Sequence, residues 1–160
     1  MHKSVKAWVK EQVDTYALKG LDTLEVGSLD VNGSVRDLFV GTYVGVDFRE
    51  GPGVDLVVDA HDLKRRFGEA AFDVVVSTEM LEHDSAFWTS LVQMGEVLIS
   101  GGHLLLTTRG NGFKPHGYPH DYWRFMPESR AMLLDLAGCD VVELGLDPQR
   151  PGIFMHGVRR

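Results

Sequence analysis

The spacing of apolar residues changes along the chain, and each change marks an expected element. Between Val5 and Tyr16, apolar residues recur every three or four positions, which places them on one face of a helix. We expect this helix to end near Gly20, because glycine commonly follows the last turn of a helix.

Further along, short apolar runs alternate with helical patterns. The predicted strands cover residues 23–26, 42–46, 55–58, 72–77, 103–108, 141–144 and 153–158. The predicted helices cover residues 33–40, with Asn32 as a possible N-cap, then 61–67 as a short helix or turn, 85–100 and 127–137. Strands alternate with helices until two strands follow directly, which predicts an α/β sheet that is parallel except for one antiparallel strand. We expect a single domain over residues 1–160, because no repeat or linker interrupts the pattern.

Composition narrows the class of protein. Hydrophobic residues make up 44% and charged residues 24% of the 160 residues, as in an ordinary globular domain. The net charge of -7 argues against nucleic acid as a partner. The single cysteine, Cys139, cannot form an intrachain disulfide, and no apolar run is long enough to cross a membrane. We therefore expect a cytoplasmic protein without a membrane partner, and the sequence leaves a homodimer open.

The stretch LEVGSLDVNGS, residues 24–34, has the form of a ligand-binding loop after a strand. In such sheets the ligand lies at the carboxyl ends of the strands, where both Gly27 and Asp47 are expected. Asp47 follows Gly27 by about 20 residues, the spacing of an acid that binds ribose hydroxyls. However, Glu25 would repel a pyrophosphate, and Leu29 stands where a dinucleotide loop has its second glycine.

S-adenosylmethionine fits this loop better than a dinucleotide. It carries an ammonium and a sulfonium but no phosphate, so Glu25 could hold the ammonium directly or through water while loop N–H groups bind the carboxylate. A pair of unit charges ~4 Å apart contributes ~4 kcal/mol at an effective dielectric constant near ~20, so the sign of one residue can decide the ligand. The alternative is that Glu25 and Asp47 are solvated strand ends and Gly27 is a plain turn.

Five segments together resemble the motifs of the class I S-adenosylmethionine-dependent methyltransferases, and specifically the small, single-domain type 11 group. They are LEVGS (24–28), YVGVD (43–47), VVDAHDL (57–63), FDVVVSTEMLEH (72–83) and VLISGGHLLLTT (97–108). The resemblance covers the whole family core, and the first loop departs from it because GSLDVNG replaces the commoner GxGxG. It implies a three-layer Rossmann-like sheet of seven strands in the order 3-2-1-4-5-7-6, with strand 7 antiparallel and helices on both faces.

The resemblance also implies a set of residues that bind the cofactor. These are Glu25, Gly27 and Ser28 at the methionine end, Asp47 at the ribose, Asp59, Ala60 and His61 at the adenine, Ser77 through its backbone carbonyl, and Glu79 near the transferred methyl. Phe48 would pack on the adenine, or else be a plain core aromatic.

Methyl transfer needs alignment above all, and a base only when the acceptor is a hydroxyl or a protonated amine. The candidate bases are His83, His116 and His120, with a capping or surface role as the alternative for His83. The long loop over residues 109–126 resembles the lid of small bacterial and phage-like family members, and some of its aromatic residues would anchor it. With the N-terminal helix, residues 1–20, it would form the substrate pocket, and the expected substrate contacts are Tyr118, Tyr122, Arg124 and Arg109.

A metal cluster is the alternative use of these polar residues. It would combine His116, His120 and Asp121 with Glu82, His83 and Asp84. Their spacing matches no strong zinc pattern, so we expect no metal. The predicted function is methyl transfer to a small-molecule or a sugar- or nucleotide-linked acceptor. A non-catalytic binding or assembly protein is the second possibility, and Glu25 and Leu29 disfavour a nicotinamide-dependent oxidoreductase.

Overall fold

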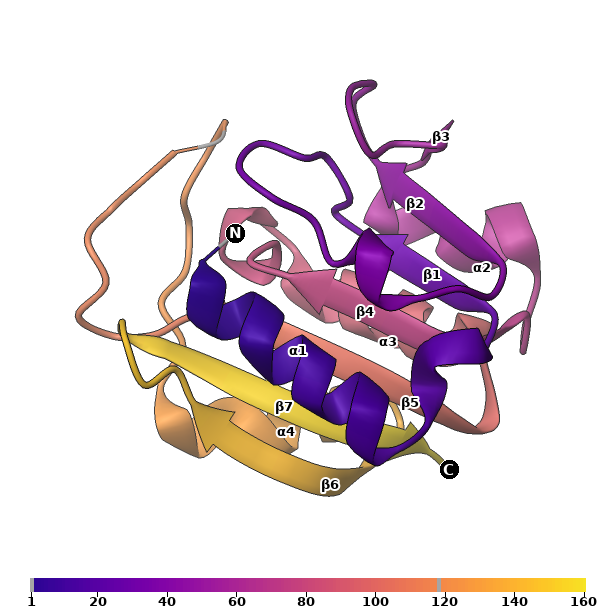
Figure 1. Cartoon of the computed structure of the whole chain (residues 1–160). Helices are drawn as coiled ribbons and strands as arrows, with labels where there is room; N and C mark the ends of the chain where they lie inside the picture. Colours follow the sequence, from indigo (N-terminus) through magenta and orange to yellow (C-terminus); the bar gives the residue numbers. More distant parts are fainter. Residues whose placement is uncertain (1, 118) are drawn as a thin grey trace.

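A single mixed sheet forms the centre of the computed structural model, which describes residues 2–117 and 119–160. The strands follow the order β3-β2-β1-β4-β5-β7-β6 (Figure 1). Their bounds are β1 Thr23–Val26, β2 Tyr43–Asp47, β3 Leu56–Val57, β4 Phe72–Thr78, β5 Leu98–Arg109, β6 Cys139–Leu146 and β7 Gly152–Arg159. Only β7 runs antiparallel to its neighbours β5 and β6 among these pairs. The predicted strand order and the antiparallel strand 7 are therefore confirmed.

Helices cover both faces of the sheet. They are α1 Lys3–Thr15, α2 Leu63–Phe67, α3 Phe87–Val97 and α4 Arg130–Leu136, with 3-10 turns η1 Leu18–Gly20, η2 Arg36–Leu38, η3 Ala60–Asp62, η4 Leu81–His83 and η5 Pro127–Ser129. α1 lies on one face and the other three helices lie on the opposite face, which gives the three predicted layers (Figure 1). Across the described residues, no helix has the length and apolar character to cross a membrane.

The two hydrophobic cores follow from the alternation of side chains along each strand. On β4, Val75 packs with residues of α2, α3 and α4, whereas Val74 and Val76 pack with residues of α1. All three side chains are fully buried. This is why the apolar run of this strand is continuous, as expected for a parallel strand that is covered on both faces.

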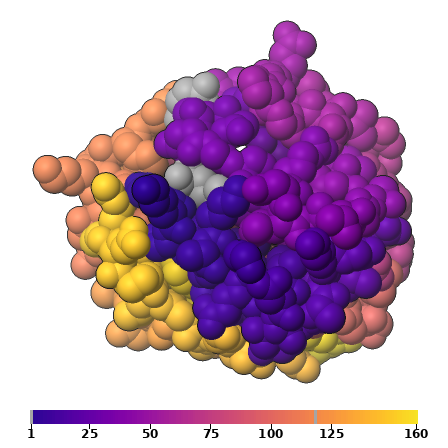
Figure 2. Space-filling model, in the orientation of Figure 1, coloured from indigo at the N-terminus to yellow at the C-terminus, as the bar shows by residue number. Residues whose placement is uncertain are grey.

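A buried polar network fixes α1 to the sheet. The Gln12 amide donates to the Glu143 carboxylate of β6 at 3.2 Å and lies 2.8 Å from Nδ1 of His156 on β7. The Trp8 indole also donates to Glu143, at 3.0 Å. Figure 2 shows the N-terminal part of the chain, in indigo, on the outer surface of the molecule. Buried polar groups that bond one another specify one docking position, so the network sets where α1 lies on the sheet.

The helix predicted over residues 33–40 is wrong. The segment is irregular apart from η2, and Asn32 is not an N-cap. The Asp30 carboxylate instead accepts the N–H of Gly33 at 2.6 Å, and Gly33 has a φ of 123°, which no helix accommodates. Val35 and Phe39 still bury their side chains, so an irregular segment supplies the apolar contacts expected of a helix.

Other boundaries shift because tertiary pairing overrides local pattern. The helix predicted over residues 85–100 ends at Val97, because Leu98 pairs with Phe72 and already belongs to β5. The helix predicted from Pro127 begins as the 3-10 turn η5 and continues as α4. The N-terminal helix expected to end near Gly20 ends at Thr15, because Ala17 has a φ of 56°, and η1 follows it.

Candidate cofactor and substrate cavity

A cavity of about 610 Å³ lies at the carboxyl ends of β1, β2 and β4. Its volume is in the usual range for a small-molecule site. The predicted site residues that line it are Glu25, Gly27, Ser28, Asp47, Phe48, Asp59, Ala60, His61, Glu79, His83, His116, His120 and Tyr122. The edge of the sheet named from the sequence is thus the edge that carries the cavity.

The first loop needs glycine for two reasons. Gly27 has a φ of 80°, and a Cβ at this position would lie 2.7 Å from Cγ of Met80. The N–H groups of Gly27 and Ser28 both donate to the Val46 carbonyl, at 2.9 and 3.0 Å, and that of Asp30 donates to the Pro52 carbonyl. The expectation that N–H groups of this loop bind a ligand carboxylate is therefore wrong for these three, because they are already bonded within the protein.

Glu25 is a nearly buried carboxylate at the floor of the cavity. The Tyr43 hydroxyl of β2 donates to it at 2.7 Å. Gly45 pairs with Glu25 across the two strands, and a Cβ there would lie 2.8 Å from the Ser28 hydroxyl of the first loop. Burial raises the pKa of Glu25 to about 7, although the Tyr43 hydrogen bond acts in the opposite direction. A carboxylate in this environment gains from a cationic ligand, which would replace the water lost by burial.

Asp47 and Phe48 follow the neighbouring strand. Asp47 accepts the N–H of Arg49 at 3.1 Å and that of Leu29 at 3.4 Å, so the backbone holds its carboxylate between two loops. Phe48 is 53% exposed, lines the cavity and has the Arg49 guanidinium 4.8 Å from its ring centre. Phe48 is therefore not the core aromatic that the sequence left as its alternative role.

Asp59 and His61, which follow β3, also line the cavity. The Asp59 carboxylate accepts the N–H of His61 at 2.9 Å. The His61 ring lies 3.0 Å from the carboxylate of Asp84, which also accepts the hydroxyl of Ser90. The His61 ring is thus oriented by a charged partner from the segment that follows η4.

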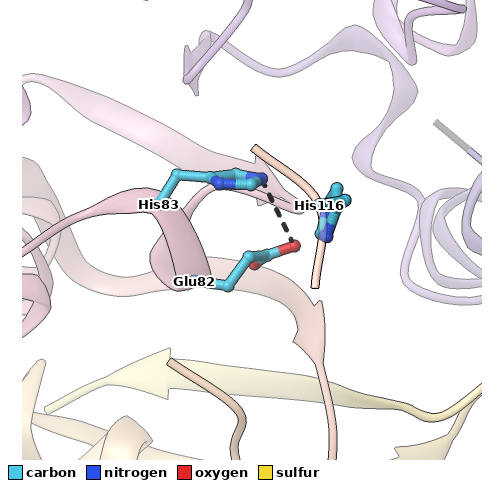
Figure 3. Close-up of side chains that lie close together, drawn as sticks. All are labelled: Glu82, His83 and His116. Atoms are coloured by element: carbon cyan, nitrogen blue, oxygen red, sulfur yellow. Dashed lines mark ion pairs between the residues drawn. The ribbon is translucent and has the colours of Figure 1, made fainter. Parts of the chain in front are cut away.

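Three polar side chains meet where η4 approaches the long loop (Figure 3). His83 Nδ1 contacts the backbone carbonyl of His120, and its Nε2 lies 4.0 Å from Oε1 of Glu82. The rings of His83 and His116 have their centres 4.8 Å apart. The structure therefore places the backbone of one predicted catalytic histidine, and the rings of the other two, within one cluster.

Glu82 is fully buried beside these histidines. Its Oε2 accepts the Thr108 hydroxyl at 2.7 Å, and its Oε1 has no hydrogen-bond partner. Burial, and next the charge of Glu79, raise the pKa of Glu82 to about 7. The sequence indicated Glu82 only as part of the metal alternative. Its position next to His83 was the one feature that could have marked it as a site residue.

Glu79 adopts an unusual backbone conformation at the end of β4. Its φ is 57°, and non-glycine residues with positive φ often mark functional sites. Its carboxylate contacts Nδ1 of His2 at 3.3 Å, the Thr107 hydroxyl at 3.2 Å and the Arg109 guanidinium. His2 also lines the cavity, so the residue that precedes α1 contributes to the cavity wall.

Three predicted residues do not line the cavity. Arg109 as a substrate contact is wrong, because its side chain is fully buried and paired with Glu79 and Asp147. Arg124 instead braces the loop, through the Asp121 carboxylate and two backbone carbonyls at 3.0 and 3.1 Å. Ser77 is buried one residue short of the strand end, and Thr78 lines the cavity in its place. Tyr118 lies outside the described residues.

The long loop is anchored by its aromatic end. The backbone N–H groups of Tyr122 and Trp123 donate to the Glu82 carbonyl at 2.8 and 3.2 Å. The Trp123 indole donates to the Asp84 carbonyl at 2.8 Å and packs against Phe87 of α3. Tyr122 also lines the cavity, so this loop is both attached to the core and part of the cavity wall.

Comparisons with known proteins agree with this geometry. A family model described as "Methyltransferase domain" matches residues 24–106, just over half of the chain. A search of curated proteins gives no match.

Solved structures share the fold at low sequence identity. A Burkholderia thailandensis 1,6-didemethyltoxoflavin-N1-methyltransferase, with 1,6-didemethyltoxoflavin and S-adenosylhomocysteine bound, is 17% identical with a TM-score of 0.79, over 97% of this chain and 78% of that one. The magnesium protoporphyrin IX methyltransferase of Synechocystis PCC 6803, with S-adenosylmethionine bound, is 16% identical with a TM-score of 0.72, over 99% and 79%. The [4+2]-cyclase SpnF is 15% identical with a TM-score of 0.70, over 94% and 81%. These likenesses establish the fold, and the family model adds that the chain belongs to the methyltransferase domain family.

Proposed function

We propose that this protein binds S-adenosylmethionine in the cavity and transfers its methyl group to a small-molecule or a sugar- or nucleotide-linked acceptor. The observation that carries this proposal is Glu25, a nearly buried carboxylate that lines the cavity, where an ammonium would compensate for the water that the carboxylate has lost. A phosphate-bearing dinucleotide would meet the same carboxylate with repulsion.

The donor set around the cavity fits the parts of this cofactor. Glu25 suits the ammonium, and the Asp47 carboxylate suits the ribose hydroxyls. Phe48 offers an exposed ring face to the adenine, and Asp59, Ala60 and His61 lie beside it on the cavity wall. When bound, the cofactor supplies a methyl group on a sulfonium, which is a good leaving group, so the protein has mainly to align the acceptor.

The polar cluster at the lid suits an acceptor that must lose a proton. His83 and His116 line the cavity, and the buried Glu82 lies directly behind them. A base within hydrogen-bond reach assists a hydroxyl or protonated amine acceptor, and a histidine can supply it near neutral pH. His83 Nδ1 is oriented by the His120 carbonyl, which leaves Nε2 as the basic nitrogen.

Two solved neighbours are methyltransferases with the cofactor or its product bound, which supports the proposal. SpnF is a cyclase, so the fold also hosts other reactions, and turnover must be tested apart from binding.

Calorimetric titration of the purified protein with S-adenosylmethionine, S-adenosylhomocysteine and NAD tests the cofactor. We expect the first two to bind at one site and NAD not to bind. A panel of hydroxyl- and amine-bearing metabolites, with S-adenosylhomocysteine formation as the readout, then tests catalysis. Binding without turnover on any acceptor would favour the alternative, a non-catalytic binding or assembly protein.

A further inference from the structure

The cluster of Glu82, His83 and His116 has a composition that cofactor binding does not explain. Each of the three side chains offers one ligand atom, and these atoms lie within 4.8 Å of one another. Glu82 and His83 come from η4, whereas His116 comes from the long loop, and Figure 3 shows the three side chains around a common space.

The Glu82 carboxylate is held in place through one oxygen, and its other oxygen has no hydrogen-bond partner. Thr108 bonds Oε2, while the fully buried Oε1 has no hydrogen-bond partner and lies on the side of His83. A buried carboxylate oxygen without a partner is costly, since it has lost water and gained nothing in exchange. A cation between this oxygen and the histidines would remove that cost.

The hydrogen bond of His83 prepares it as a ligand. Its Nδ1 can only donate to the His120 carbonyl, so the neutral ring carries its lone pair on Nε2, toward Glu82. Metal-binding histidines are commonly oriented in this way, with the other ring nitrogen bonded to a backbone carbonyl. Nδ1 of His116 lies 3.6 Å from the Asp121 carboxylate and 3.4 Å from Nη2 of Arg124, so an anionic and a cationic group both border this ring.

From this arrangement we infer that Glu82, His83 and His116 form a binding site for a divalent transition-metal ion of the zinc type. Two imidazoles and one carboxylate make a donor set that Zn²⁺ accepts, and three protein ligands leave a further position open. The sequence alone favoured a site without metal, because residues 82 and 83 are adjacent and 116 is far away, a spacing that matches no zinc motif.

Metal binding would draw the long loop toward η4. Ligand atoms around a metal at about 2.1 Å are roughly 3 to 3.5 Å apart, closer than the separations of up to 4.8 Å seen here. Glu82 is buried and bonded to Thr108, whereas the His116 side chain is 40% exposed. His116 is therefore the ligand that can move, and the ion would fix the loop over the cavity.

The proposed metal site lies beside the cavity. The ion could therefore act on the methyl acceptor, a role that rests on the proposed function. His83 and His116 line the cavity, so an open coordination position is accessible to an acceptor. A metal-bound hydroxyl loses its proton more readily, so the ion would both position an oxygen acceptor and make it a better nucleophile.

Zinc binding to the tag-free full chain tests the inference without any activity measurement. After treatment with a chelator, calorimetry with Zn²⁺ should give one ion per chain, and Co²⁺ should give the intense visible absorption of a four-coordinate site. Glu82→Gln, His83→Ala and His116→Ala should each weaken Zn²⁺ binding by more than about 100-fold.

The matched control is His120→Ala. It removes a histidine ring from the same loop but keeps the backbone carbonyl that orients His83, so Zn²⁺ binding should be unchanged. Because His116 lies on the exposed loop, the His116→Ala variant should fold even if Glu82→Gln, at a buried position, does not, and it then tests the site alone.

The inference is overturned if the wild type binds no Zn²⁺, or if binding survives all three substitutions. S-adenosylmethionine titrations on the same samples separate the two proposals. Cofactor binding without Zn²⁺ binding leaves the proposed function standing, whereas Zn²⁺ binding without cofactor binding removes the proposed function and keeps the metal site.

Discussion

At the scale of single residues, Glu25 makes cofactor affinity depend on pH. Its pKa of about 7 in the free protein means that the carboxylate must lose a proton before it can hold an ammonium. Affinity for S-adenosylmethionine should therefore fall as the pH is lowered from about 7 to about 5, by up to about tenfold per pH unit. Calorimetry across this range should show the fall in the wild type and a nearly flat response in Glu25→Gln.

Glu25 should also lower the stability of the ligand-free protein when its carboxylate is ionised. Its pKa is raised on folding from 4.5 to about 7, so burial of Glu25 costs no stability below pH 4.5 and destabilises the protein progressively as the pH rises from 4.5 to about 7. Without ligand, Glu25→Gln should be more stable than the wild type at pH 8, by about 1–3 kcal/mol, and no more stable at about pH 4. Urea unfolding at the two pH values measures this. A Gln variant less stable than the wild type at pH 8 would contradict it.

Gly27, which the sequence places in the first loop, meets a steric requirement there. Gly27→Ala would introduce a side chain at a φ of 80° and place its Cβ 2.7 Å from Met80, so we expect a loss of about 1–3 kcal/mol. The control is Gly20→Ala, where a Cβ would meet nothing within 4 Å and stability should change by less than about 0.5 kcal/mol. Equal effects of the two substitutions in thermal unfolding would refute the steric argument.

Residues at strand ends were predictable because parallel strands bring their carboxyl ends to one edge. The directions of their side chains were harder to predict. Arg109, expected to begin the long loop, is the last residue of β5, and it turns inward because Asp147, far along the chain, provides a buried partner. The importance of Glu82 could not be predicted from the sequence, because only the folded chain brings His116 beside it.

At the scale of elements, the position of α1 depends on the amide of Gln12. Gln12→Ala would leave the Glu143 carboxylate and the His156 ring without this partner, and should cost about 2–3 kcal/mol. Glu11→Ala, on the exposed side of the same helix, should change stability by less than about 0.5 kcal/mol. Denaturant unfolding of both variants checks this, and similar values for the two would show that the network contributes little.

Elements with strong periodicity were predicted well, and elements shaped by local polar contacts were not. The apolar run of β4 and the helical spacing of apolar residues in α1 each involve several buried residues. Because several residues point to the same element, one exception does not change the prediction. The segment over residues 33–40 has apolar residues that suit a helix, but Gly33 has a φ of 123°, outside the helical region, and only the short turn η2 forms. A weak helical propensity does not decide the conformation of such a segment.

At the scale of the whole molecule, the buried His156 should contribute to unfolding by acid. Burial lowers its pKa to about 4, so the stability gained from the neutral ring is present above the unfolded value of 6.5 and is lost as the pH falls from 6.5 toward 4. Ionised Glu25 acts in the opposite direction, so the comparison must be between variants. Between pH 7 and pH 4, His156→Gln should lose about 2 kcal/mol less stability than the wild type. An equal loss in both would exclude this role.

The function proposed for the whole molecule requires that the cavity at the sheet edge fits a cationic adenosine cofactor. Calorimetric titration of the wild type and of Glu25→Gln with S-adenosylmethionine at pH 7.5 tests it most directly. We predict one site in the wild type and a loss of affinity of at least about tenfold in Glu25→Gln. Absence of binding in the wild type, or equal affinity in the two proteins, would contradict the claim.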